Sequence, residues 1–138
     1  MITGRKLTSE EKEALAIEIR QFLLDNELWA DVTIFFNGKA FSTDDRNGNY
    51  FYDDPEHLVV LEDMDPREFL EYVAPTPEDD IVYMSFEGPF YGCMNFHWEN
   101  GPDFDLRIQQ EFEDILEKYG VYYELGHKWN LSCCYLWD

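Results

Sequence analysis

The residues with the clearest chemical character are carboxylates, and they are concentrated between Thr43 and Asp80. This stretch holds thirteen Asp and Glu residues against two cations, Arg46 and Arg67. Carboxylates at this density can match a surface of Lys and Arg, bind a hard cation such as Ca²⁺, or act in pairs as acid and base. The set consists of Asp44, Asp45, Asp53, Asp54, Glu56, Glu62, Asp63, Asp65, Glu68, Glu71, Glu78, Asp79 and Asp80.

Charge matching is the interpretation that the whole chain favours. The protein has 138 residues and a formal net charge of −20. B-DNA carries one phosphate charge per ~1.7 Å of axis, and a protein presents a comparable field only by crowding Asp and Glu on a rigid scaffold. Direct binding to nucleic acid or anionic lipid is disfavoured, because phosphate contacts need Lys and Arg. We therefore expect a basic protein surface as the partner, and neither nucleic acid nor a membrane.

In charge and size, the chain resembles the acidic nucleic-acid mimics that viruses and mobile elements use against restriction or CRISPR nucleases. This resemblance implies a non-enzymatic inhibitor that occupies the basic groove of a nuclease or another nucleic-acid-binding protein. Carboxylates would match Lys and Arg, and tyrosines would anchor the contact. The partner-binding residues predicted on this basis are Asp44, Asp45, Tyr50, Tyr52, Asp53, Asp54, Glu56, Glu62, Asp63, Glu78, Asp79 and Asp80.

Three other interpretations of the same acidity stay open. An immunity-type protein that neutralises a basic toxin would use the same physics with a different partner. A housekeeping module could carry the charge for solubility alone, with no cationic partner. The 17% aromatic content also allows a homodimer through a sheet face.

A calcium site is a weaker interpretation of the carboxylates. Residues 44–56 offer clustered oxygen ligands and a glycine. An EF-hand loop that began at Asp44 would need an acid at its third position and a glycine at its sixth, but Arg46 is third and Gly48 is fifth. The spacing therefore does not match.

A zinc site is the other metal interpretation. Cys93 with His97, and His127 with Cys133, have even spacings that would place each pair on one face of a strand. Two such strands side by side could hold a tetrahedral zinc, with Cys134 adjacent. Cysteines in mid-strand more often pack as small hydrophobes. We predict no metal and no cofactor.

Enzymatic motifs are absent from the sequence. It contains no Gly-rich phosphate loop, no Gly-x-Ser-x-Gly and no His-Glu-x-x-His. Carboxylates are so abundant that no pair stands out as acid and base. The prediction is therefore a protein that is not an enzyme, with a metal-binding or enzymatic domain as the alternative.

The cysteine count and the hydropathy indicate the compartment. Three cysteines with one adjacent pair make a poor disulfide framework, which favours a reducing cytoplasm. No apolar run approaches the roughly 20 residues of a membrane span. We expect a cytoplasmic protein.

The elements that must position these residues follow from caps and turns. Thr8 and Glu11 form a capping-box pattern, Asn37-Gly38 is a hairpin signal, and Asp103 and Gly120 bracket an amphipathic stretch. The order predicts a single α+β domain over 1–138, with a mostly antiparallel sheet of about six to eight strands. Three helices are expected at 8–26, 66–73 and about 103–119. Strands are expected at 30–36, 39–43, 57–61, 81–87, 90–98, 121–125 and 129–137, with a further one near 50–52.

Overall fold

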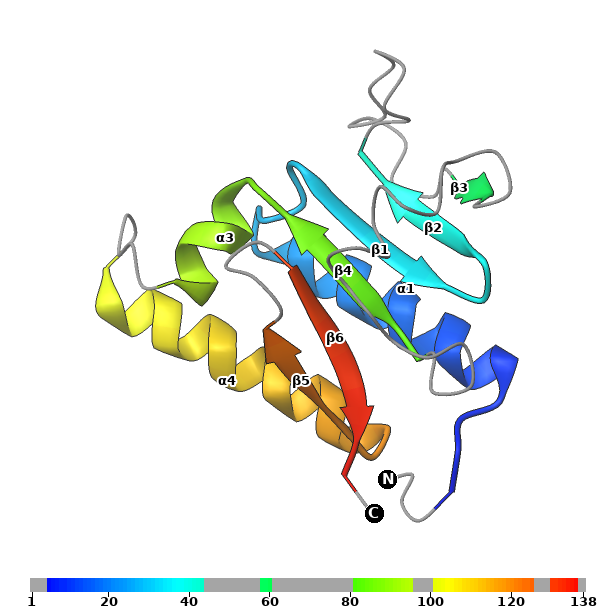
Figure 1. The fold of residues 1–138 in the computed structure, drawn as a ribbon. Coiled ribbons are helices and arrows are strands. Elements are labelled where there is room, and N and C mark those ends of the chain that lie inside the picture. The colour runs from blue at the N-terminus through cyan, green and yellow to red at the C-terminus, as the bar shows by residue number, and fades with distance from the viewer. Residues whose placement is uncertain (1–4, 44–57, 61–80, 96–100, 126–129, 137–138) are drawn as a thin grey trace.

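The chain folds as an α+β protein in which one antiparallel sheet carries helices on one face (Figure 1). The computed structural model describes residues 5–43, 58–60, 81–95, 101–125 and 130–136. The sheet has six strands in the order β3-β2-β1-β4-β6-β5, and every neighbouring pair is antiparallel. The predicted fold class is confirmed. The elements are α1 (Ser9–Asp25), β1 (Val32–Phe36), β2 (Lys39–Ser42), β3 (Leu58–Val60), β4 (Tyr83–Phe86), α3 (Pro89–Met94), α4 (Pro102–Lys118), β5 (Val121–Leu125) and β6 (Asn130–Tyr135).

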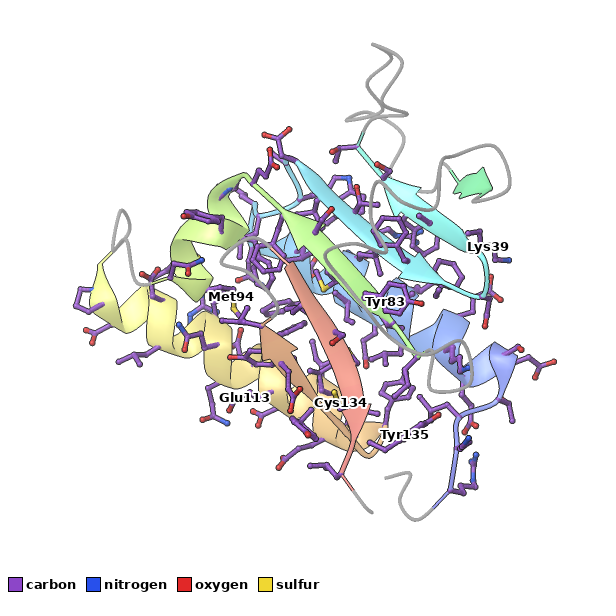
Figure 2. The ribbon with its side chains drawn as sticks, in the orientation of Figure 1. Lys39, Tyr83, Met94, Glu113, Cys134 and Tyr135 are labelled. Carbon is purple, nitrogen blue, oxygen red and sulfur yellow. The ribbon has the colours of Figure 1, made fainter. Side chains whose placement is uncertain are left out.

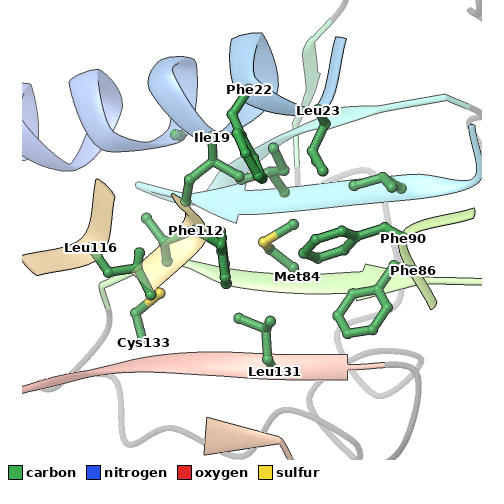
Figure 3. Packing of buried hydrophobic residues seen from close by; sticks show 14 of the residues in the cluster. Ile19, Phe22, Leu23, Met84, Phe86, Phe90, Phe112, Leu116, Leu131 and Cys133 are labelled. Carbon is green, nitrogen blue, oxygen red and sulfur yellow. The ribbon is translucent and has the colours of Figure 1, made fainter. Parts of the chain in front are cut away.

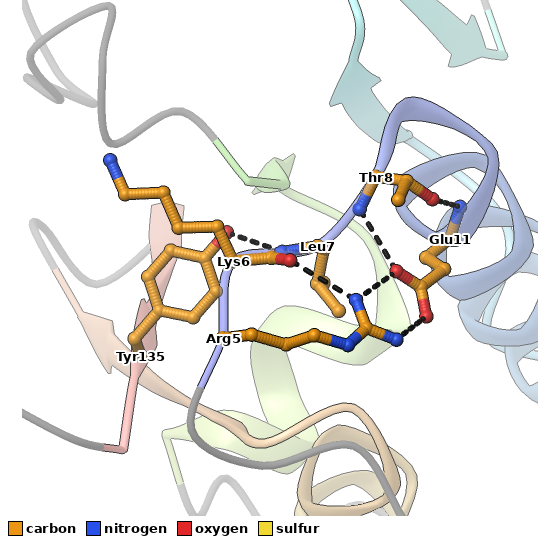
Figure 4. A network of polar contacts seen from close by, with 6 residues as sticks. All are labelled: Arg5, Lys6, Leu7, Thr8, Glu11 and Tyr135. Atoms are coloured by element: carbon orange, nitrogen blue, oxygen red, sulfur yellow. Dashed lines mark hydrogen bonds and ion pairs between the residues drawn. The ribbon is translucent and has the colours of Figure 1, made fainter.

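The start of α1 is fixed by the predicted capping box. The Thr8 hydroxyl accepts from the backbone N–H of Glu11 (3.1 Å), and the Glu11 carboxylate accepts from the N–H of Thr8 (2.9 Å). Arg5 donates to both oxygens of Glu11 at 2.7 Å, so that Arg5 and then the Thr8 N–H lower the pKa of Glu11 to about 2 (Figure 4). The Leu7 N–H donates to the Tyr135 hydroxyl at 3.0 Å. This segment therefore joins the first helix to the last strand.

The hairpin of β1 and β2 turns where the sequence predicts. Asn37 and Gly38 both have positive φ, 50° and 76°, as a two-residue turn of type I′ requires. This turn pairs Phe36 with Lys39, the residues that flank it. The Asn37 side chain donates to the Ser9 carbonyl at 2.8 Å, which holds the turn against the start of α1.

The core lies between the helices and one face of the sheet (Figure 3). Phe112 of α4 is fully buried at its centre, with ring centroids 5.4 Å from Phe90, 5.4 Å from Tyr123 and 6.3 Å from Phe22. One side chain thus connects α1, α3, α4 and β5. The other core residues alternate along the strands, as one buried face requires; they include Ile34, Phe36, Phe41, Val82, Met84, Phe86, Leu131 and Cys133.

The central strands are buried on their second face as well. All five residues of β1 are buried. Phe35 faces away from the main core and is only 1% exposed; its cross-strand partner Tyr83 is 6% exposed, with ring centroids 6.1 Å apart. Aromatic side chains such as Phe35 and Tyr83 are therefore buried on this second face of the sheet as well.

The predicted strand at 90–98 is wrong, because residues Pro89–Met94 form the helix α3. Pro89 stands at the first helical position, where its missing N–H costs nothing. Phe90, Cys93 and Met94 are the buried residues, and their spacing of three and four is helical. The aromatic residues in this segment favour a strand by propensity, so the helical spacing of its buried residues was not recognised from the sequence. Gly88 caps the helix, packed closely against the Ala30 carbonyl.

The helix α4 forms as predicted, with a different cap. Gly101, at φ 94°, is the N-cap and Pro102 the first helical residue, so the predicted capping role of Asp103 is wrong. Asp103 lies in the first turn, where its charge still complements the helix dipole. Gly120 has φ 71° just after the helix, and this predicted stop is confirmed. The predicted helix at 66–73 and the strand near 50–52 lie outside the described residues.

Candidate partner-binding site

The residues predicted to bind a partner all lie outside the described ranges, in the stretch from Asp44 to Asp80. Their role as a charge-matching surface stays a prediction. A pocket at the β5 end of the sheet, between α4 and β5, offers a site among the described residues. It measures about 340 Å³ and is lined by Glu113, Leu116, Glu117, Val121, Tyr122, Tyr123 and Leu136.

Gly120 positions the two walls of this pocket. Its left-handed conformation ends α4 and turns the chain, so that β5 runs beside the helix that it follows. On the helix, Leu116 points into the core (Figure 3). Glu113, labelled in Figure 2, and Glu117 are exposed and lie one turn apart. On the strand, Val121 is buried at the base. The pocket therefore has an apolar floor and an acidic rim.

The ring of Tyr123 completes the walls. Tyr123 is half-buried and packs at a tilt against Phe112 of the core, with ring centroids 5.4 Å apart. Burial, and secondly the charge of Glu113, raise the pKa of Tyr123. Tyr122 projects to the other side of β5 and is 39% exposed, and Leu136 is 54% exposed. A ligand in this pocket would meet rigid aromatic and aliphatic surface beside negative charge.

Among the described residues, no cation pairs with the two carboxylates of the rim, Glu113 and Glu117. The nearby Lys118 instead pairs with Glu18 of α1. Arg107 of α4 pairs with Glu111 at 3.0 Å. Both cations of α4 thus pair with other acids, and no described cation offsets the negative charge of Glu113 and Glu117.

The strand β5 borders the pocket and is the last in the sheet order, so one of its edges has no neighbouring strand among the described elements. The Leu136 N–H donates to the Gly120 carbonyl at 3.0 Å. In an antiparallel ladder, hydrogen-bonded pairs recur at every second residue, so the backbones of Tyr122 and Glu124 also point toward β6. In agreement, the Cys133 N–H donates to the Val82 carbonyl of β4, on the other side of β6.

The backbone groups of the intervening residues must therefore point outward. These residues are Val121, Tyr123 and Leu125. Among the described residues, no backbone hydrogen bond engages their outward N–H and C=O groups. Val121 is fully buried, so the part of this edge that another chain could reach begins at Tyr123 and includes the exposed Leu125. Open strand edges are the places where another chain can add a strand. The pocket and the edge form one continuous feature, which we call the α4–β5 site.

A polar cluster lies on the sheet face opposite the helices. The Tyr122 hydroxyl donates to Glu124 at 3.1 Å, and this bond raises the pKa of the tyrosine. Cys134 faces the same side (Figure 2); partial burial, and secondly Glu124, raise the pKa of its thiol. A thiol with a raised pKa stays protonated near neutral pH, and the protonated thiol is a poor nucleophile.

The cysteines of the alternative zinc interpretation do not share a strand face. Cys93 lies on α3 rather than on a strand, and it is buried in the core, as is Cys133 of β6. Burial raises the pKa of the Cys133 thiol. His97 and His127 lie outside the described residues. Within the described ranges, no three His, Cys, Asp or Glu side chains are arranged to hold a metal ion.

Protein families, curated proteins and solved structures gave no match to this chain. Function is therefore argued from the residues alone. None of the helices in the described ranges is both long enough and apolar enough to cross a membrane.

Sequence reasoning missed the α4–β5 site. Glu113 and Glu117 are acidic residues of the long helix, and Tyr122 and Tyr123 are aromatic residues that follow it. The signal that joins them is local: two glutamates four residues apart, a glycine that ends the helix, and then two tyrosines. Recognising it requires the turn at Gly120, which brings the strand back along the helix.

Proposed function

We propose that the protein is a non-enzymatic binding protein. It engages the basic, nucleic-acid-handling surface of another protein and blocks that surface by competition. The observation that carries this proposal is the formal net charge of −20 on a chain whose interior is packed with aromatic and aliphatic side chains. Charge of this density on a rigid body imitates a polyanion, whereas the same charge on a disordered tail would not hold a shape.

Two regions contribute to the acidic surface in this proposal. The stretch from Asp44 to Asp80 supplies the highest density of carboxylates in the sequence. The exposed side of α4 adds Glu113 and Glu117, which lack ion pairs among the described residues. A basic partner would be drawn to such a surface by long-range attraction, which speeds association and weakens with salt.

The experiment that tests the proposal is capture followed by competition. The protein is immobilised, incubated with lysate at low salt, and eluted with a salt gradient. The retained protein is then purified, and its affinity is measured at several salt concentrations with and without duplex DNA. We expect a basic nucleic-acid-binding protein whose log affinity falls linearly with log salt and which DNA displaces. A partner whose affinity ignores salt, or that binds DNA and this protein together, would contradict the proposal.

Charge reversal locates the surface. The quadruple variant D53K/D54K/D79K/D80K should weaken the partner's affinity at least tenfold. The control variant on α1, Glu10→Lys with Glu13→Lys, reverses charge in a helix that is not part of that stretch of sequence. The control variant should keep affinity within about threefold, since long-range attraction alone is largely screened at physiological salt. Thermal unfolding of each variant confirms that the fold is retained.

A further inference from the structure

We propose that an extended segment of the partner, containing Lys or Arg, binds along the outer edge of β5 as an added strand. One basic side chain of that segment enters the pocket between Glu113 and Glu117. The inference rests on the proposed function in one respect, the basic character of the partner. It goes beyond that function by naming the edge, the pocket and the form of the ligand.

The backbone of β5 supplies the first part of the argument. Tyr123 and Leu125 direct their N–H and C=O groups away from β6, as the register of the ladder requires. Val121 has the same register but is fully buried, so it is not part of the edge that a partner could reach. Strands pair at a spacing of ~4.8 Å, so an added strand would lie immediately beside the pocket. Main-chain hydrogen bonds of this kind give affinity without demanding a particular sequence.

The pocket supplies the specificity. Side chains of an added strand alternate between the two faces of the sheet, and those on the helix side would point toward α4. There Glu113 and Glu117 offer carboxylates, and Leu116 and Leu136 offer aliphatic surface. Lys and Arg have this same division, an apolar stem with a charged end. The planar guanidinium of Arg also stacks on aromatic rings such as Tyr123.

A second copy of the chain fits the site less well. Pairing of β5 with its own copy would bring Glu113, Glu117 and Glu124 of both molecules toward one another. Like charges directly opposed across a ladder are destabilising. Two chains of net charge −20 also repel at long range. Charge complementarity therefore favours a basic segment over self-association.

The test uses the full-length, ¹⁵N-labelled protein and a synthetic seven-residue peptide in which Val and Arg alternate. One control peptide replaces each Arg with Glu, and a second is N-methylated on the amides that would face β5. On titration with the first peptide, we expect the amide signals of Tyr123 and Leu125 to shift and their hydrogen exchange to slow. Neither control peptide should bind measurably.

Paired variants separate the pocket from general charge. Glu113→Gln with Glu117→Gln should weaken peptide binding about tenfold. The matched control Glu10→Gln with Glu13→Gln, on α1, should change affinity by less than twofold. The inference is overturned if both double variants weaken binding equally, if the shifted amides lie away from β5, or if no binding is seen. It is also overturned if the β5 amides are already protected in a dimer of the free protein, as sedimentation would show.

These outcomes can be separated from failure of the proposed function. If a basic partner is captured, and the variant Glu113→Gln with Glu117→Gln holds it as tightly as the unaltered protein, only the inference about β5 is wrong. If the peptide binds β5 as described and the partner that is captured ignores salt, the proposed function is wrong and the docking edge stands.

Discussion

Replacing Gly88 with alanine should destabilise the protein more than its place between β4 and α3 suggests. A Cβ atom at this position would lie 2.2 Å from the Ala30 carbonyl oxygen and 3.0 Å from the carbonyl carbon. Ordinary van der Waals contact begins more than ~1 Å farther away. Because the opposing atoms are backbone, no rotamer change relieves the overlap. The chain must shift, and the bond from the Glu87 N–H to the Asp31 carbonyl (3.1 Å) shifts with it.

Overpacking of this kind costs ~1–3 kcal/mol, and the backbone clash places Gly88→Ala near the upper end, at about 3 kcal/mol. For a chain of this size that corresponds to a fall of roughly 10 °C in Tm. Gly38→Ala is the matched control, because nothing lies within 4 Å of its added Cβ and only the positive φ of 76° opposes the change. It should cost about 1 kcal/mol. Urea unfolding followed by far-UV circular dichroism measures both, and equal losses would refute the close approach of Gly88 to Ala30.

Three further outcomes follow from the contacts of single side chains. Phe112→Ala should cost ~3–5 kcal/mol in urea unfolding, because its ring is fully buried among three others; a loss below 1 kcal/mol would mean that the core is loose. The Glu11 carboxyl should titrate near pH 2 by NMR, and its pKa should lie nearer the usual value in Arg5→Gln. The ionised Glu11 carboxylate stabilises the fold fully above its usual pKa, and this stabilisation is lost as the pH falls toward 2. Cys133 should resist a thiol reagent at pH 8 until the protein unfolds, since burial raises its pKa; rapid reaction in the native state would contradict its place in the core.

The elements that the sequence predicts well are those with local signals. Thr8 and Glu11 define the start of α1 within one turn, and Asn37-Gly38 defines the first hairpin through a backbone conformation that few residues tolerate. The second half of the chain is predicted at β4, α4, β5 and β6 for similar reasons. In each case the physical requirement is met by residues within about four positions of one another.

The failure at α3 shows where local signals stop. The segment Phe90–Trp98 is rich in aromatics, which favour strands by propensity alone. Tertiary packing overrides that preference, because Phe90 must reach Phe86 and Phe112 in the core. Pro89 after Gly88 was the available sign of a helix start.

The α4–β5 site could not be predicted from the sequence, because it depends on which described residues do not pair with Glu113 and which described strands do not pair with β5. Whether Glu113 lacks an ion pair depends on where Lys118 points, and that is decided by Glu18, a hundred residues earlier. Whether β5 has an open edge depends on the strand order, which no short motif encodes. Spatial order of this kind requires the folded chain.

The position of β6 has a consequence for how the protein is made. Among the described strands β6 comes last in sequence, yet it lies between β4 and β5, inside the sheet. A nascent chain on the ribosome can form α1 and the first hairpin early, but β4 waits with one side unpaired until residues 130–135 emerge. Premature termination before residues 130–135 would remove an internal strand of the sheet rather than an edge strand. The resulting chain would expose unpaired strand edges and be prone to aggregation or degradation.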